Sequence, residues 1–240
     1  MSRTPRIGAP RAAVTLLLLG ALAYSAWLTE VFVRTGLDPV RTYVSELAAT
    51  DQPYGTLFRT TDLVAGLLLL AGSCWALLRT ERRLWAVVGW AGLALFGAST
   101  VADSRLPLSC TPTADAACAA REAAGLVPLT HTAHATSSAL AMVGALVGMV
   151  ALTVAARRYR DRPPLARTGA VLVVVGLAAT GWTLGAIAAF EAGNGTWGLG
   201  AAQRVQLLCV VAWIVVLAVA ERRAAAPAAP AERPRAGAAR

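Results

Sequence analysis

The chain of 240 residues is 57% hydrophobic and only 15% charged, a composition that excludes a water-soluble domain with a polar surface. Its formal net charge is +9, and arginine supplies every Lys-or-Arg position. These arginines flank long apolar segments and form no continuous basic groove, so the sequence predicts no nucleic-acid binding. The partners that it predicts are membrane lipids, above all those of the anionic inner leaflet.

Six apolar segments, nearly free of charge, account for most of the chain: 12–33, 60–78, 84–102, 128–156, 168–190 and 201–220. A helix needs roughly 20 apolar residues to cross a hydrocarbon core of about 30 Å. We therefore predict an all-α, polytopic membrane protein in which residues 12–220 form a bundle of six transmembrane helices.

Arginine is concentrated in segments 1–11, 79–83, 157–167 and 221–240. Because basic loops stay in the cytoplasm, both the N- and the C-terminus are predicted to be cytoplasmic, in a multi-pass protein of the cell (inner or plasma) membrane. Residues 1–11 and 221–240 are expected to be cytoplasmic tails, the second one disordered because alanine, proline and arginine dominate it. The same arginine–alanine bias is typical of bacterial proteins.

The first segment allows two interpretations. Basic residues precede the apolar run Val14–Leu22 and the triplet Ala21-Leu22-Ala23, a pattern that also fits a secretory signal with a cleavage site. The apolar run continues to Val33, which is long enough to span, so an uncleaved first helix is favoured. Cleavage would leave the orientation of the other spans unchanged.

The loop between the first two segments contains Asp38 followed by Pro39, a pair typical of a helix start. Apolar residues then recur at helical spacing: Val40, Tyr43, Val44 and Leu47. We predict a short amphipathic helix near 39–49 that lies at the outer membrane interface.

Two cysteines, Cys110 and Cys118, share the third gap, which the arginine distribution places outside the cell. In an oxidising compartment they are expected to form a disulfide that closes a small loop. A metal-binding pair is the alternative.

The fourth segment is longer than one crossing requires, and one of its faces carries small residues together with one histidine: Thr130, His134, Ser137, Ala141, Gly144 and Gly148. Such a stripe predicts close helix–helix packing. Gly181 and Gly185 are expected to give the fifth span a similar contact.

Polar residues gather where the predicted spans meet their outer boundary: Glu30, Asp62, Asp103, His131, His134, Glu191, Gln203 and Arg204. The uncharged stretches from Asp62 to Arg79 and from Arg204 to Glu221 are about one helical turn short of a full crossing. Asp62 and Arg204 are therefore expected one turn inside the membrane, where opposite charges at similar depth make them candidate partners.

The two histidines are three residues apart on one predicted helix. Together with Asp103 they could supply the three ligands of a catalytic zinc site. A histidine–carboxylate pair without metal could act as an acid–base couple or a proton relay. Helix ends also need polar residues, so a purely structural role stays open. No cofactor other than zinc is indicated.

One stretch has a family resemblance. Val44-Ser45-Glu46-Leu47-Ala48, followed by Gln52-Pro53-Tyr54-Gly55-Thr56-Leu57-Phe58-Arg59, resembles the first-loop signature of domain-of-unknown-function family 998 (DUF998). Asp103 at the end of the third span and His131 with His134 at the start of the fourth are similar to it as well. The resemblance implies a six-span membrane protein over about residues 12–220, and a turn after Leu47 that differs, because Ala48 replaces the usual glycine. It singles out Ser45, Glu46, Asp62, Asp103 and His134 without naming a reaction.

Three hypotheses follow. The first is an outward-facing polar pocket that binds or moves a lipid or a small polar ligand, with these pocket candidates: Glu46, Asp62, Asp103, His131, His134 and Arg204. The second is an intramembrane hydrolase of lipid-like substrates, with zinc on His131, His134 and Asp103 and with Glu46 or Asp62 as the base. The third is a structural or assembly subunit. The sequence predicts no particular oligomeric state.

Overall fold

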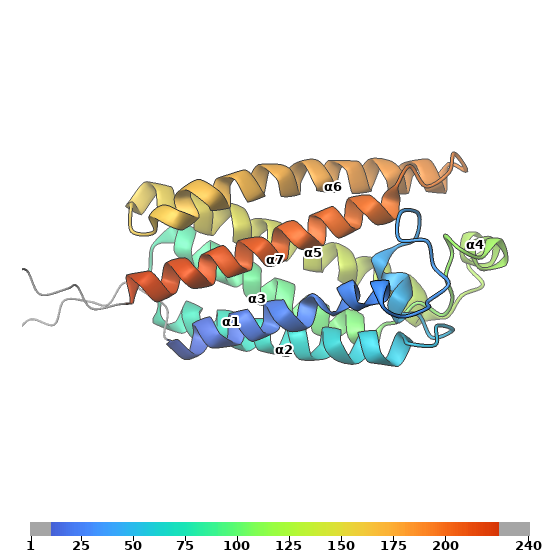
Figure 1. Cartoon of the computed structure of the whole chain (residues 1–240), viewed down its shortest axis with the longest axis horizontal. Helices are drawn as coiled ribbons and strands as arrows, with labels where there is room; N and C mark the ends of the chain where they lie inside the picture. The colour runs from blue at the N-terminus through green and yellow to red at the C-terminus, as the bar shows by residue number, and fades with distance from the viewer. Residues whose placement is uncertain (1–10, 226–240) are drawn as a thin grey trace, which may run out of the picture.

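The computed structural model describes residues 11–225, which contain helices and no strand. Figure 1 shows the long helices lying along one common direction, with the longer loops and α4 at one end of the molecule. The elements are α1 (Arg11–Tyr24), η1 (Ala26–Val31), η2 (Val44–Ala48), α2 (Gly55–Arg79), α3 (Leu84–Arg105), α4 (Ala116–Ala123), α5 (Leu129–Tyr159), η3 (Leu165–Gly169), α6 (Ala170–Glu191) and α7 (Leu199–Ala224). The elements η1 and η2 are 3-10 turns, and η3 is a π-helical turn.

Six helical segments of the described chain, each of 21 to 31 residues, are long and apolar enough to cross a membrane. They coincide with the six predicted segments, so the all-helical, multi-pass architecture is confirmed. Large apolar side chains such as Leu22, Val171 and Val174 are exposed on the outside of the bundle, where lipid would cover them. Helix α7 continues to Ala224, beyond the predicted end at 220. Most of the predicted tails, 1–11 and 221–240, lies outside the described residues.

The helices form a ring. Helix α5 packs on α3, α3 on α2, α2 on α1, α1 on α7 and α7 on α6. Helices α5 and α6 contact each other sparsely, although η3 touches both of them and α7 as well. In Figure 1, α6 lies along the outer edge of the bundle. The ring is therefore loosest between α5 and α6.

The tightest packing lies between α3 and α5, whose contact is the most extensive in the described chain. A Cβ atom added to Gly144 would lie 2.5 Å from the backbone nitrogen of Phe96, and one added to Gly92 would lie 2.7 Å from the backbone nitrogen of Gly148. These distances leave no room for a side chain. Glycine is required here because the two backbones touch, as in other close-packed membrane helix pairs.

The predicted stripe of small residues on α5 is confirmed for all members except Thr130, which is exposed. The expectation for α6 is wrong: no atom lies within 4 Å of a Cβ built on Gly181 or on Gly185. These two glycines face open space because α6 packs on α7 through its other side, which buries Gly176, Ala179 and Thr183.

The structure replaces the predicted amphipathic helix near 39–49 by a turn at 39–42 and the short element η2. Tyr43 between them is extended, with φ −54° and ψ 143°, which interrupts any helix. The reason is burial: Leu47 and Ala48 pack with Trp27 and Phe58 in a small core at the end of the bundle. Residues 38–48 thus cover that end of the bundle.

Gly144→Ala tests the contact between α3 and α5. Because the new methyl group would meet the Phe96 backbone, we expect overpacking to lower the free energy of unfolding by about 1–3 kcal/mol. The melting temperature should fall by about 2–4 °C per kcal/mol. The matched control Gly181→Ala has open space and should keep or raise the melting temperature, since alanine favours helix. Equal melting temperatures for Gly144→Ala and the unmodified chain would contradict this packing.

Candidate functional site

A cavity of about 380 Å³ opens among the helices at the end of the bundle that carries η2 and α4, which we call the loop end. Residues of all six long helices and of both loop elements line it. Its wall on α6 extends from Thr180 to Glu191, a length of roughly 16 Å along the helix. The cavity therefore reaches from the loop end to about the middle of a bilayer.

The structure brings together four of the six predicted pocket candidates. Asp62, Asp103, His131 and His134 line the cavity. Glu46 and Arg204 do not belong to its wall, and both are buried and paired next to it.

Asp103 and His134 are part of a hydrogen-bonded network that joins α3 to α5. Ser137 donates to one carboxylate oxygen of Asp103, and Ser138 donates to the other at 2.7 Å. His134 Nδ1 lies 2.9 Å from the carbonyl oxygen of Leu106 and 3.2 Å from Asp103 Oδ1. Since a carbonyl oxygen can only accept, this nitrogen carries a proton. The polar groups of Asp103 are thus largely satisfied within the protein.

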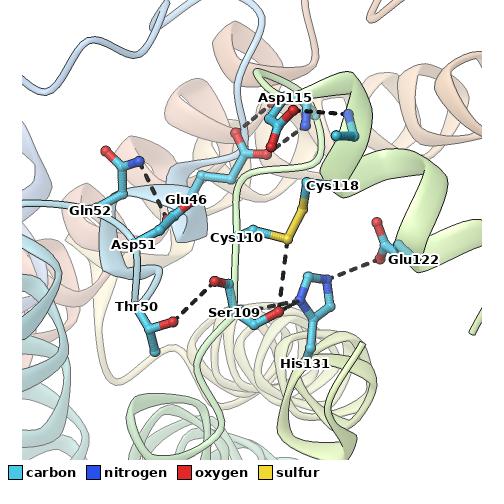
Figure 2. The surroundings of a disulfide bond; sticks show 12 residues. Glu46, Thr50, Asp51, Gln52, Ser109, Cys110, Asp115, Cys118, Glu122 and His131 are labelled. Atoms are coloured by element: carbon cyan, nitrogen blue, oxygen red, sulfur yellow. Dashed lines mark hydrogen bonds and ion pairs between the residues drawn. A yellow bond between two sulfur atoms is a disulfide. The ribbon is translucent and has the colours of Figure 1, made fainter. Parts of the chain in front are cut away.

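His131 belongs to a different network at the loop end, shown in Figure 2. Its Nδ1 accepts a hydrogen bond from the backbone N–H of Ser109 at 3.0 Å, so the ring proton of the neutral form is on Nε2. That nitrogen lies 3.4 Å from Glu122 Oε1 on α4. Cys110 and Cys118 form a disulfide beside it, which fixes the loop that carries α4.

The predicted zinc ligands do not form one ligand set. His134 is directed to Leu106 and Asp103, whereas His131 is directed to Ser109 and Glu122. Within residues 11–225, no group of three or more His, Cys, Asp or Glu side chains is arranged to hold a metal ion. Glu46, one of the two proposed bases, is turned away from both histidines toward Thr113. The geometry gives the hydrolase hypothesis no support.

Arg204 is paired with Glu30, so the expected pair of Arg204 with Asp62 is wrong. Arg204 Nε and Nη2 donate to the two carboxylate oxygens of Glu30 at 2.7 and 2.6 Å. Its Nη1 donates to the carbonyl oxygens of Thr42 and Gly200, each at 3.1 Å. Depth in the membrane could not show whether Glu30 or Asp62 is the partner of Arg204, because both acids lie at the same boundary. The chain turns at Ser25 after α1, and this turn brings Glu30 to α7.

Glu46 fastens η2 to the disulfide loop. Its carboxylate accepts hydrogen bonds from the backbone N–H of Thr113 at 2.7 Å and from the Thr113 hydroxyl at 2.5 Å. Because the side chain is fully buried, desolvation raises its pKa from 4.5 to about 7, although the hydrogen bonds from Thr113 oppose this shift.

Asp62 differs from the other acids inside the bundle. It lies on α2 and lines the cavity, and its side chain has no hydrogen bond or ion pair with any residue of the described chain. A carboxylate at membrane depth without a partner is costly, and such residues usually mark a functional site. Sequence position singled out Asp62, but only the structure shows that its expected partner is occupied elsewhere.

The model of the family described as protein of unknown function (DUF998) matches residues 17–220 of the chain. No curated protein and no solved structure matches it.

Arg204→Met would leave the buried carboxylate of Glu30 without its partner. We expect the free energy of unfolding to fall by about 3–5 kcal/mol, measured by denaturant titration in detergent. The double variant Glu30→Met/Arg204→Met should recover part of this loss, because no charge is then stranded. The control Arg41→Met removes an exposed ion pair with Asp38 and should change the value by less than about 1 kcal/mol. A loss in Arg204→Met no larger than that in Arg41→Met would contradict the buried pair.

The raised pKa of Glu46 predicts a pH dependence of stability. Between pH 4.5 and about pH 7 the unfolded chain has lost this proton and the folded chain keeps it. Stability from this group is therefore full below pH 4.5, falls as the pH rises to about 7, and is constant above that. The fall should be at most about 3 kcal/mol.

Glu46→Gln cannot ionise, so its unfolding midpoint should lack this component. The measurement is the difference in the unfolding midpoint between the unmodified chain and Glu46→Gln. It is taken at several pH values from about 4 to about 8, a range that contains both pKa values of Glu46. A difference that does not vary with pH would show that Glu46 ionises normally in the folded protein.

Proposed function

This chain belongs to DUF998, a family of proteins of unknown function, and we propose its function from its own cavity. It binds a small amphiphilic ligand, a lipid or a polar molecule with an apolar part, in the cavity at the loop end. The observation that carries the proposal is the cavity itself. Its volume of about 380 Å³ lies in the range of roughly 300–1,000 Å³ typical of ligand sites.

The wall of the cavity suits a ligand of two characters. Its apolar portion includes Met142, Leu184 and Ile187 on α5 and α6. Its polar portion includes Gln206, which donates to the Thr180 hydroxyl at 2.7 Å and accepts from another wall residue, Thr183, at 3.2 Å. These hydrogen bonds hold polar groups in place beside an apolar surface, as specific binding sites require.

The loose contact between α5 and α6 supports entry of the ligand from the lipid phase. Wall residues lie on both sides of this seam, with Ser138 and Ala139 on α5 and Leu184 and Ile187 on α6. A ligand dissolved in the bilayer would reach the cavity through the seam without crossing the tight α3–α5 contact on the other side of α5.

The proposal includes an orientation and a membrane. Arginines at the opposite end of the bundle, among them Arg82, Arg157 and Arg222, support a cytoplasmic location for that end in the cell membrane of a bacterium. The disulfide of Cys110 with Cys118 supports an oxidising, outer location for the loop end. The cavity would then face outward, and its partners would be lipids and lipid-soluble molecules, not nucleic acid.

Ala139→Trp tests ligand binding, because it places a large side chain on the cavity wall. The control is Leu140→Trp, at the neighbouring exposed position, which is not part of the wall. The full chain in nanodiscs of phosphatidylethanolamine and phosphatidylglycerol is analysed by native mass spectrometry, with octyltrimethylammonium, octanol and octanesulfonate added in turn.

We expect about one retained lipid or probe per unmodified chain, at least a tenfold lower retained fraction in Ala139→Trp, and unchanged retention in Leu140→Trp. Retention of nothing by the unmodified chain, or equal retention by Ala139→Trp, would reject the cavity as a binding site. A structural subunit would then be the better description.

A further inference from the structure

The cavity wall is acidic. It contains four carboxylates, Asp62, Asp103, Glu122 and Glu191, and no arginine. Histidines lie beside Asp103 and Glu122, whereas the side chains of Asp62 and of the exposed Glu191 have neither a hydrogen bond nor an ion pair with any other described residue. The field inside the cavity therefore favours a positively charged occupant.

The arginines close to the cavity are committed to other groups. Arg204 is neutralised by Glu30. Arg59 donates to the carbonyl oxygens of Ala48 and Ala49 at 2.6 and 3.3 Å. Neither can turn toward Asp62 without leaving buried acceptors unpaired, so neither arginine serves as its partner.

Aromatic side chains form another part of the same wall: Tyr24, Trp27, Tyr43 and Phe58. Aromatic faces attract ammonium groups, and acidic residues combined with aromatic ones are the usual recognition elements for organic cations. In the described chain the cation–π contact lies elsewhere, between Arg83 and Tyr159 at the opposite end. The aromatic residues of the cavity are thus free of any internal cation.

Trp27, a residue of the cavity wall, has a buried polar atom without a partner. Trp27 is only 8% exposed, and its indole N–H is buried without a hydrogen-bond partner in the described chain. Buried donors are nearly always paired, so this N–H lacks an acceptor that such groups usually have.

The size of the cavity decides between an inorganic and an organic cation. One water molecule occupies about 30 Å³ of the liquid, so a volume of about 380 Å³ has room for an organic body, and within residues 11–225 no three ligating side chains are arranged to hold a metal ion. Apolar wall residues such as Met142 and Ile187 would contact a hydrocarbon part.

We propose that the cavity selects a monovalent organic cation, an ammonium group carried on an apolar body, and that Asp62 is the counter-ion of its nitrogen. This inference rests on the proposed binding function. The same chemistry is present in a lipid with an ethanolamine or choline headgroup and in a free amphiphilic amine.

The test is calorimetric titration of the full chain in dodecyl maltoside with octyltrimethylammonium, octanol and octanesulfonate. We expect the cation to bind at least tenfold more tightly than the neutral and anionic probes. Asp62→Asn should weaken binding of the cation at least tenfold and leave binding of octanol unchanged. The control Asp51→Asn, an exposed loop acid outside the cavity wall, should leave all affinities unchanged.

A second variant keeps the test decisive if Asp62→Asn does not fold. Phe58→Leu removes an aromatic face of the wall and retains an apolar side chain, so it should weaken binding of the cation about threefold more than binding of octanol. A structural role alone would change both affinities in parallel.

The outcomes separate the two proposals. If native mass spectrometry shows an adduct that Ala139→Trp abolishes, but the probes bind equally or Asp62→Asn retains cation affinity, cation selectivity is wrong and the binding function stands. If no probe or lipid binds at all, both fail. The mass of the adduct shows whether the ammonium group comes from a lipid or from a free amine. If the ligand is a lipid, the unmodified chain should retain phosphatidylethanolamine over phosphatidylglycerol. If it is a soluble amine, the chain should retain octyltrimethylammonium and neither lipid.

Discussion

Inside a bilayer no water is available to a polar side chain, so every such group in this bundle depends on another protein group for its hydrogen bonds. Most of them have one. Trp213 donates to the Thr153 hydroxyl, Arg204 is enclosed by Glu30 and two backbone carbonyl oxygens, and the carboxylate of Asp103 is held by two serines and His134. These bonds link different helices, and so the need to satisfy polar groups also determines which helices are neighbours. Asp62 is informative because it departs from this rule.

The bundle is built unevenly around the cavity. On one side, glycines let the backbones of α3 and α5 touch, which joins α2, α3 and α5 into a tightly packed layer. On the other side, α6 packs on α7 and meets α5 only sparsely. Residues 38–48 cover the loop end and are anchored there by Arg204 and by Gln203, whose side-chain oxygen accepts from the Val44 N–H at 2.9 Å. The cavity lies between the tightly packed layer of α2, α3 and α5 and the loosely attached pair of α6 and α7, and residues 38–48 cover it at the loop end.

Sequence periodicity and charge predicted the features that depend on the average properties of a segment, which are the six spans and the small-residue face of α5. The spans follow from length and hydropathy, and the α5 stripe follows from residue size, so both could be read without knowing the fold. Which charged side chains pair with each other could not be predicted in this way. Arg204 pairs with Glu30 and not with Asp62 because the chain turns at Ser25, a local break that no apolar pattern announces. The helix predicted near 39–49 is wrong for a similar reason: Tyr43 is extended, and the fold buries Leu47 with Trp27, a contact distant in sequence that no local pattern predicts. Helix α4, a short alanine-rich run that contains Cys118, was not predicted from the sequence.

The lining of the cavity argues against a mere packing defect. Cavities that result from imperfect packing are small and apolar, and they stay dry because nothing in them attracts water. Here the wall combines an unpartnered carboxylate, an unpaired indole N–H and a hydrogen-bonded glutamine. An ionised Asp62 without a counter-ion and shielded from water would cost several kcal/mol that a neutral residue would not cost. A chain that combines this volume with an acid on its wall is therefore better explained by an occupant that fills the volume and pairs with the acid than by a fault in packing.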